Sequence, residues 1–302
     1  MQLITRSDFD GLVCAVLLKE AGIIDSYRFA HPKDVQDGKI EVSENDVLAN
    51  IPFVKGCGLW FDHHMSEDER NMFNTEFKGA SRWEKSCARV IYDYYGGANR
   101  FVGIEDMMIA VDKTDSGDLT VEEILHPKDW ILLSFMMDPR TGLGRYKDYR
   151  ISNYQLMEQL IDMCRTMKIE EILANPDVNQ RVVRYFEQEE LYRKMIIDNA
   201  KVNGKVLVID LRNTEEILTG NRFVEYSLFP EVLTSVRVMW GLNKQNTVFA
   251  VGHSIIKRGS KVNVGSLMLK NGGGGHFQVG TCQVTNERSE KALEEVVTAL
   301  NA

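Results

Sequence analysis

Apolar and polar positions repeat with two different periods over the first third of the chain. Short apolar runs at residues 2–6, 46–51 and 58–61 are typical of buried strands, whereas residues 11–21 and 82–95 repeat their apolar positions with a helical period. Strands that alternate with helices at this spacing predict a parallel β-sheet covered by helices.

The pattern changes after residue 150. Residues 151–167 and 178–199 carry helical periodicity with many charges, which predicts a helical connector. Strand-like runs then return and an amphipathic helix closes the chain: the expected strands are 205–211, 236–240 and 247–252, and the helix is 287–300. We therefore expect an α/β fold in three parts: a parallel-sheet domain over residues 1–150, a helical connector over 151–200 and a smaller α/β domain over 201–302.

The composition narrows the class of protein. A chain of 302 residues exceeds what one hydrophobic core usually organises, which agrees with two domains. Its net charge of -8 argues against binding along extended nucleic acid, because that mode needs a broad basic surface. Small phosphate substrates remain compatible with an acidic chain if positive charge is concentrated in one cleft.

Several features favour a protein of the cytoplasm with no membrane partner. No apolar run is long enough to span a bilayer, and the first residues lack the pattern of a signal peptide. The five cysteines are scattered without a CxxC pair, which in a reducing compartment is typical of buried small apolar side chains rather than disulfides. They are Cys14, Cys57, Cys87, Cys164 and Cys282.

Two aspartates directly follow the first expected strand. Asp8 and Asp10 stand one residue apart, just before Gly11. The loop after a strand of a parallel sheet faces the ligand crevice, and two carboxylates there suit a hard divalent cation. Asp and Gly are also common in turns, so a turn without a ligand is the alternative.

The phrase Asp62-His63-His64 follows the apolar run at residues 58–61. Oxygen and imidazole ligands together suit manganese, iron or zinc better than calcium. The alternative is that His63 only caps a following helix at residues 66–70.

A further aspartate, Asp112, follows the apolar stretch 107–111. We interpret this stretch as a third strand end that leads into an acidic loop containing Asp115 and Asp118. Acidic loops are usually only solvated, and it is the expected strand end that makes Asp112 a candidate ligand.

Four consecutive glycines precede a histidine near the end of the chain. Gly272, Gly273, Gly274 and Gly275 let the backbone approach a charged ligand closely and present N–H groups to it, and His276 adds a contact for phosphate. A flexible linker is the alternative, but the run lies between apolar segments at 264–269 and 279–284, where a linker is not expected.

The order and spacing of these motifs resemble those of the DHH phosphoesterases that carry a DHH-associated C-terminal domain. The resemblance covers nearly the whole chain. The family includes single-strand DNA exonucleases, nanoRNases, cyclic-dinucleotide phosphodiesterases and proteins described as exopolyphosphatases. The resemblance implies a manganese-dependent phosphoesterase that hydrolyses a phosphodiester of a short oligonucleotide or dinucleotide, with polyphosphate as the alternative substrate.

The resemblance also implies roles for individual residues. Asp8, Asp10, His63 and Asp112 match metal ligands, and His64 matches a residue beside the substrate that orients it or protonates the leaving group. The run from Gly272 to Gly275, with His276, matches the substrate-binding loop of the second domain. We expect the active cleft to lie between the domains, with this loop facing the metal.

Two positions depart from the family pattern. Arg6 stands where many members have a histidine, and Asn50 stands where an aspartate bridges two metals. Guanidinium does not bind metal at ordinary pH, and a neutral amide is a weaker ligand than a carboxylate, so we expect Asn50 to be a weak metal ligand beside Asp8, Asp10, His63 and Asp112. We therefore expect one firmly bound Mn²⁺, with a second ion left open, and Arg6 at the site as a source of positive charge. A family member that binds a nucleotide without hydrolysing it is the alternative.

Two arginines lie in the glycine-containing segment 138–145. The guanidinium groups of Arg140 and Arg145 suit phosphate oxygens, so both are candidate substrate ligands; a surface turn between helices is the alternative. In the connector, the apolar positions Leu156, Leu160 and Met163 indicate core packing or the contact of a homodimer.

Overall fold

The structure is a computed structural model, and it describes residues 1–64 and 76–302. The chain divides into two compact units. The first holds Met1–Asp118 and His126–Tyr185, and the second holds Leu119–Leu125 and Phe186–Ala302. The helix expected at residues 66–70 lies outside the described residues.

The first unit is built on a five-stranded sheet in which the described strands all run parallel, in the order β2-β1-β3-β4-β5. The strands are β1 (Gln2–Thr5), β2 (Ser26–Phe29), β3 (Asp46–Ala49), β4 (Leu59–Asp62) and β5 (Gly79–Ser81). The helices are α1 (Phe9–Glu20), α2 (Pro32–Gln36), α3 (Cys87–Tyr94), α4 (Glu105–Ser116), α6 (Asp129–Met137), α7 (Asn153–Thr166) and α8 (Ile169–Ala174). Short 3-10 turns are η3 (Gly97–Asn99), η4 (Pro139–Thr141) and η5 (Leu143–Arg145). The predicted parallel sheet is confirmed.

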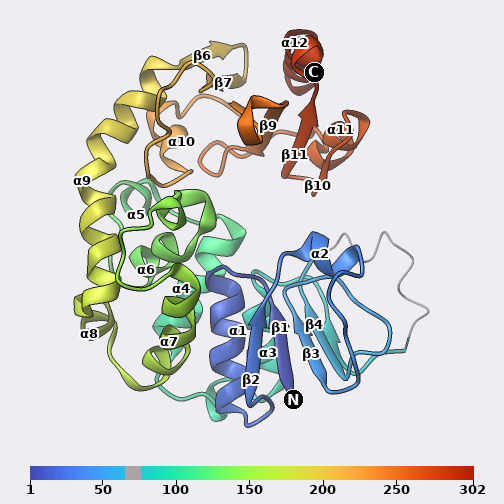
Figure 1. The fold of residues 1–302 in the computed structure, drawn as a ribbon, viewed down its shortest axis with the longest axis vertical. Coiled ribbons are helices and arrows are strands. Elements are labelled where there is room, and N and C mark those ends of the chain that lie inside the picture. The colour runs from blue at the N-terminus through green and yellow to red at the C-terminus, as the bar shows by residue number, and fades with distance from the viewer. Residues whose placement is uncertain (65–75) are drawn as a thin grey trace. The chain divides into compact units, whose positions relative to one another are not determined.

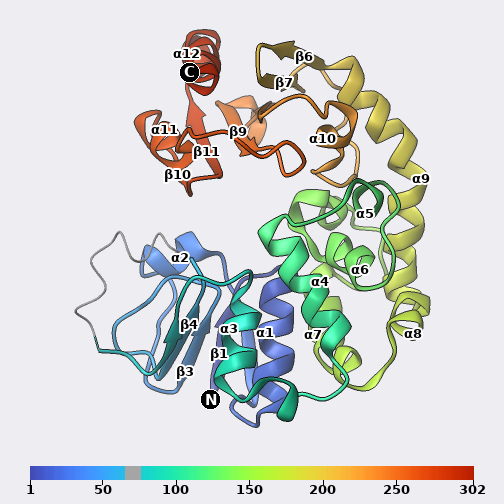
Figure 2. The same ribbon diagram turned by 180° about the vertical axis from the view of Figure 1, so that it is seen from behind.

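Burial explains how these layers pack. Helix α1 is buried from Phe9 to Leu18, because it lies against the sheet and is covered in turn by α3, α4 and α7 (Figures 1 and 2). A second apolar cluster that includes Leu48 and Trp60 also packs on the strands of this sheet. On α7, Leu156 and Leu160 are completely buried, so core packing accounts for these two apolar positions of the expected connector.

The second unit holds a six-stranded mixed sheet in the order β10-β11-β9-β8-β7-β6, in which β7 and β8 run parallel. Its strands are β6 (Ala200–Asn203), β7 (Val206–Asp210), β8 (Thr234–Trp240), β9 (Thr247–His253), β10 (Gly274–Gly275) and β11 (Val279–Val284). Its helices and turns are α5 (Val121–Leu125), α10 (Val224–Leu228), η6 (Leu242–Lys244), α11 (Val264–Lys270), η7 (Asn286–Arg288) and α12 (Ser289–Asn301). Phe249 of the sheet, Met268 of α11 and Val296 of α12 share one apolar core.

The connector is divided between the two units. Helices α7 and α8 belong to the first unit, and the long helix α9 (Pro176–Asp198) passes from the first unit into the second. The compact units therefore do not divide at residue 150. All five cysteines are free, as expected; four of them are buried, but Cys57 is only half-buried. Burial raises the pKa of the Cys87 thiol to about 12. Among the described residues, no helix is long and apolar enough to cross a membrane.

Candidate metal centre

The first two aspartates occupy the turn between β1 and α1. Asp8 is the N-cap of α1, and its Oδ1 accepts a hydrogen bond from the Gly11 amide at 3.0 Å. A Cβ on Gly11 would lie 1.9 Å from the carbonyl oxygen of Arg6, so only glycine permits this tight entry into the helix. The turn places Asp10 one residue into α1, with its side chain in the interior of the first unit.

Asp10 is held between α1 and the start of α3. Its two carboxylate oxygens accept hydrogen bonds from the backbone amides of Cys87 at 3.0 Å and Ala88 at 2.8 Å. Burial raises the pKa of Asp10 well above its usual value, and the nearby carboxylates of Asp115 and Asp8 raise it further, although the two amides act in the opposite direction. A carboxylate in such surroundings requires a compensating cation to remain ionised at low energetic cost.

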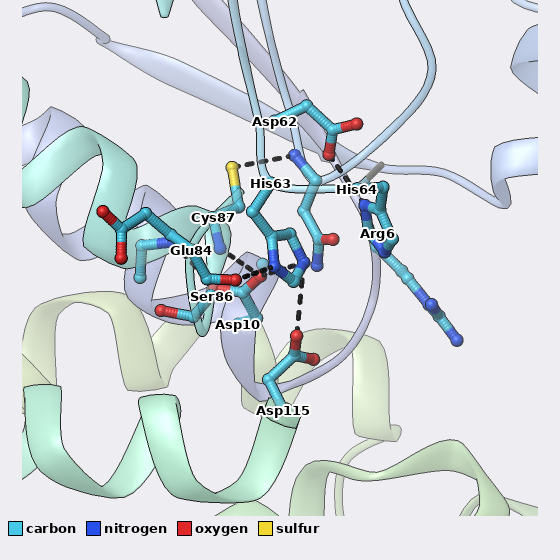
Figure 3. Close-up of polar contacts among 12 residues, drawn as sticks. Arg6, Asp10, Asp62, His63, His64, Glu84, Ser86, Cys87 and Asp115 are labelled. Carbon is cyan, nitrogen blue, oxygen red and sulfur yellow. Dashed lines mark hydrogen bonds and ion pairs between the residues drawn. The ribbon is translucent and has the colours of Figure 1, made fainter. Parts of the chain in front are cut away.

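The ring of His63 is oriented by a backbone carbonyl. Nδ1 lies 3.2 Å from the carbonyl oxygen of Glu84, which assigns the ring proton to Nδ1 and leaves the lone pair on Nε2. Nε2 lies 3.2 Å from Oδ2 of Asp115 and 3.8 Å from Oδ2 of Asp10 (Figure 3). It is buried and makes no hydrogen bond of good geometry within the described part of the chain.

These three side chains form a group that could hold a metal. One ligand atom from each of Asp10, His63 and Asp115 lies within 4.8 Å of the other two. An imidazole lone pair that faces two carboxylates is repelled by them, unless a proton or a metal ion lies between them. The donor set of two carboxylates and one imidazole fits a divalent transition metal.

The second histidine of the motif has a different partner. Nδ1 of His64 donates a hydrogen bond to Oδ1 of Asp62 at 2.8 Å, and the two histidine rings lie 4.2 Å apart. Burial acts to lower the pKa of His64, but the carboxylate of Asp62 outweighs it and raises this pKa to about 9. His64 is thus cationic at neutral pH in the metal-free protein, beside the group formed by Asp10, His63 and Asp115.

The interpretation of residues 107–111 as a strand end is wrong. These residues belong to helix α4, which runs from Glu105 to Ser116 and ends at Gly117 in the left-handed conformation. The carboxylate of Asp112 is not in the metal-binding group: it accepts hydrogen bonds from Ser86 Oγ at 2.7 Å and from Arg89 Nη2 at 2.7 Å and Nε at 2.9 Å. Asp115, one turn further along, reaches His63 instead.

The residues that depart from the family pattern both contact Asp8. Arg6 Nε lies 2.9 Å from Oδ2 of Asp8, and the side-chain amide of Asn50 donates to Oδ1 at 3.2 Å. Asn50 has a φ of 56°, a left-handed conformation that asparagine tolerates better than most residues. Asp8 is therefore surrounded by fixed donors rather than by other carboxylates and imidazoles.

Most of the glycine run is required by the fold of the second unit. Gly272 has a φ of 80°; a Cβ on Gly273 would lie 2.0 Å from the carbonyl oxygen of Thr281; and Gly275 has a φ of 156°. Gly274 differs, because a Cβ there would meet no described atom within 4 Å. Gly274 and Gly275 pair with β11 as β10, so the run leads into the sheet and is not a linker, and His276 is exposed directly after it.

The two arginines of segment 138–145 lie in the first unit. Arg140 Nε donates to Oδ1 of Asp138 at 2.7 Å. Partial burial acts to lower the pKa of Arg140, whose side chain is 46% exposed, but the carboxylates of Asp138, Asp8 and Asp115 raise this pKa above its usual value. Arg145 is exposed on η5, and its Nε donates to the carbonyl oxygen of Gly142 at 3.2 Å.

Solved structures with similar folds identify the family. A pGpG-specific phosphodiesterase, PggH from Vibrio cholerae, is 45% identical with a TM-score of 0.83, and the match covers 99% of this chain and 98% of that chain. A DHH domain described as a member of the s1p family of ribosomal proteins is 14% identical (TM-score 0.56; 99% and 86% covered). The exonuclease RecJ bound to manganese is 11% identical (TM-score 0.50; 99% and 90% covered).

Comparisons with protein-family models and with curated proteins find no match. The identity to the Vibrio phosphodiesterase over nearly the full length of both chains is sufficient by itself: this chain belongs to the DHH family of phosphoesterases. Its class is therefore that of a hydrolytic phosphoesterase with an α/β fold. The motif residues that resemble the family, from Asp8 to His64, are gathered at the carboxyl ends of β1, β3 and β4.

Proposed function

We propose that the protein hydrolyses the phosphodiester bond of a linear dinucleotide of the pGpG type. The single observation that carries the proposal is the 45% identity to a pGpG-specific phosphodiesterase over nearly the whole of both chains. The geometry at Asp10, His63 and Asp115 supports it, since this group offers ligands for a divalent cation. The acidic net charge also favours a small substrate over long nucleic acid.

We propose that Asp10, His63 and Asp115 hold one Mn²⁺ in this reaction. When bound, the cation supplies Lewis-acid activation of water and neutralises charge on the phosphate. The backbone amides of Cys87 and Ala88 fix the carboxylate of Asp10, and the carbonyl of Glu84 fixes the ring of His63, so the ligands are oriented in advance.

The remaining motif residues supply charge around the substrate. His64, whose proton is stabilised by Asp62, is suited to hold a phosphate oxygen or to protonate the leaving oxygen. Arg6 and Arg140 add positive charge near Asp8, which favours one metal over two. Substrate contacts from Gly272–Gly275 and His276 remain a prediction, as does a cytoplasmic location.

The test is hydrolysis of a panel with Mn²⁺ and with chelator. The panel holds pGpG, a linear diadenylate, a cyclic dinucleotide, a longer oligonucleotide and polyphosphate. We expect Mn²⁺-dependent cleavage of pGpG that is lost in His63→Ala and retained in His126→Ala, the same change at an exposed histidine of the first unit. Preferred cleavage of polyphosphate, or tight binding of pGpG without turnover, would contradict the proposal.

A further inference from the structure

A pocket in the first unit opens beside the loop that carries Asp8. Its volume is about 210 Å³. Its lining comes from the β1–α1 loop, from the end of α6 with the η4–η5 turns that follow it, and from the first turns of α7. The lining residues are Ser7, Met137, Pro139, Gly142, Gly144, Arg145, Asn153 and Met157.

The size of the pocket suits one planar ring and not a dinucleotide, because pockets for drug-sized ligands measure roughly 300–1,000 Å³. Met137 and Met157 are buried side chains that supply apolar walls, and thioethers adapt well to the faces of an aromatic ring. Ser7 Oγ lies 3.0 Å from the sulfur of Met157, which ties the β1–α1 loop to α7 at this wall.

The amide of Asn153 is oriented by a buried cation. Arg181 is completely buried, stacks on Tyr149 at 4.0 Å, and donates through Nε to Oδ1 of Asn153 at 2.8 Å. Since the carbonyl end of the amide faces Arg181, the Nδ2 end faces the other way, toward Gly144 on the pocket wall, where an added Cβ would lie 3.3 Å from Nδ2. The pocket is therefore presented with a fixed N–H donor.

A second source of donors lies on the same rim. The guanidinium of Arg145 rests against Gly142, where an added Cβ would lie 2.4 Å from Nη2, and its Nε donates to the Gly142 carbonyl. Asn153 and Arg145 thus offer N–H groups to a ligand in the pocket that the methionines help to line. Guanine presents two acceptors, O6 and N7, on one edge, whereas adenine replaces O6 with an amino donor.

We propose that this pocket reads a guanine base of the substrate through Asn153 and Arg145. The inference rests on the proposed function and extends it by naming the base that the first unit selects. Ser7 of the pocket wall precedes Asp8 directly, and Arg6 on its other side pairs with Asp8, with its Nε 2.9 Å from Oδ2. A base held in the pocket would therefore lie against the loop that carries Asp8 and leads into α1, the helix that carries Asp10.

The test compares equilibrium binding of pGpG and of linear diadenylate with chelator present, so that it does not depend on hydrolysis. Asn153→Asp keeps an oxygen for Arg181 but replaces the donor with an acceptor, which repels guanine O6 and accepts from the adenine amino group. We expect the parent to prefer pGpG by about tenfold or more, and the variant to lose that preference. Asn99→Asp, the same charge change at an exposed position of η3, should keep it.

Equal affinity of the parent for the two dinucleotides overturns the inference. It is also overturned if Asn153→Asp melts at the parent temperature and still prefers pGpG over linear diadenylate as strongly as the parent does. Undetectable binding of both also overturns it. The proposed function is judged separately, by Mn²⁺-dependent turnover. Selective binding of pGpG without turnover contradicts the proposed function alone, whereas turnover of both dinucleotides with equal kcat/KM contradicts the guanine pocket alone.

Discussion

Asp112 and Asp115 lie one turn apart on α4 and are predicted to respond oppositely to the same change. Asp115 is partly exposed, and its carboxylate contacts Nε2 of His63. In Asp115→Asn the metal group loses one of its two carboxylates. Because even residues that only support a metal ligand cost about 10–100-fold in affinity when removed, we expect Mn²⁺ affinity to fall by at least about 100-fold.

The stability of the metal-free Asp115→Asn protein should be unchanged or slightly higher. The charge of Asp115 raises the pKa of the buried Asp10, so its removal relieves a repulsion between carboxylates. Among the described residues Asp115 is paired with His63 and not with a permanent cation, so only its longer-range attraction to Arg140 and His64 offsets part of this relief.

Asp112→Asn should instead lower stability. Asp112 accepts two hydrogen bonds from Arg89, and the side chains are 12% and 24% exposed, so the pair is only partly screened by solvent. Hydrogen bonds to charged groups contribute about 1.5–3 kcal/mol, and asparagine retains an acceptor for Ser86. We expect a loss of about 2 kcal/mol, which corresponds to a fall in Tm of about 4–8 °C.

Thermal denaturation with chelator and titration with Mn²⁺ separate the two effects. Asp115→Asn should melt like the parent and bind Mn²⁺ weakly, whereas Asp112→Asn should melt earlier and bind Mn²⁺ within about tenfold of the parent. If Asp112→Asn instead cost as much Mn²⁺ affinity as Asp115→Asn, the assignment of Asp115 to the metal would be refuted.

Three further predictions test other parts of the chain. Arg237→Met leaves the buried carboxylate of Glu225 unpaired, so the free energy of unfolding should fall by about 3–5 kcal/mol. In thermal denaturation, the double variant with Glu225→Gln should recover part of this loss. Gly274→Ala should melt at the parent temperature but bind the dinucleotide more weakly, whereas Gly273→Ala should melt at a lower temperature because its Cβ clashes with β11. Full affinity in Gly274→Ala would show that the glycine run serves packing and not substrate binding. Asn50→Asp places a second carboxylate beside that of Asp8, so the Tm measured with chelator should fall. Added Mn²⁺ should restore the Tm, and more than one ion should bind per chain; binding of a single ion would contradict this prediction.

The sequence predicted the first sheet well because β1, β3 and β4 are short apolar runs that end at polar residues, a pattern produced by strands buried on both faces. It did not predict β2, whose residues are half-buried or exposed, or β5, which is three residues long. At an edge of a sheet, pairing with the neighbouring strand decides the conformation, and no periodic signal of burial is needed.

The candidate site was predicted in part for a related reason. Asp10 and His63 follow strands directly, so the position of the strand end was enough to bring them together. Asp115 was missed because Met107–Val111 was interpreted as a strand, although methionine and alanine favour a helix, and only a helix places Asp112 and Asp115 on neighbouring positions of one face. The supporting carbonyl of Glu84 has no sequence signal, since every residue carries a carbonyl.

Asp8 and Asp10 show how environment separates two identical side chains that stand one residue apart. Asp8 caps α1 and has its charge balanced by Arg6, by the Asn50 amide and by the Gly11 amide, so it is satisfied without a metal. Asp10 faces the interior, where burial and neighbouring carboxylates raise its pKa, and two backbone amides do not offset them. A bound cation therefore stabilises the ionised form of Asp10 far more than that of Asp8. Arg6 and Asn50, which replace a histidine and an aspartate of the family pattern, both contact the carboxylate of Asp8. We therefore expect the two replacements to remove the metal ion that Asp8 would bind and to leave the ion at Asp10.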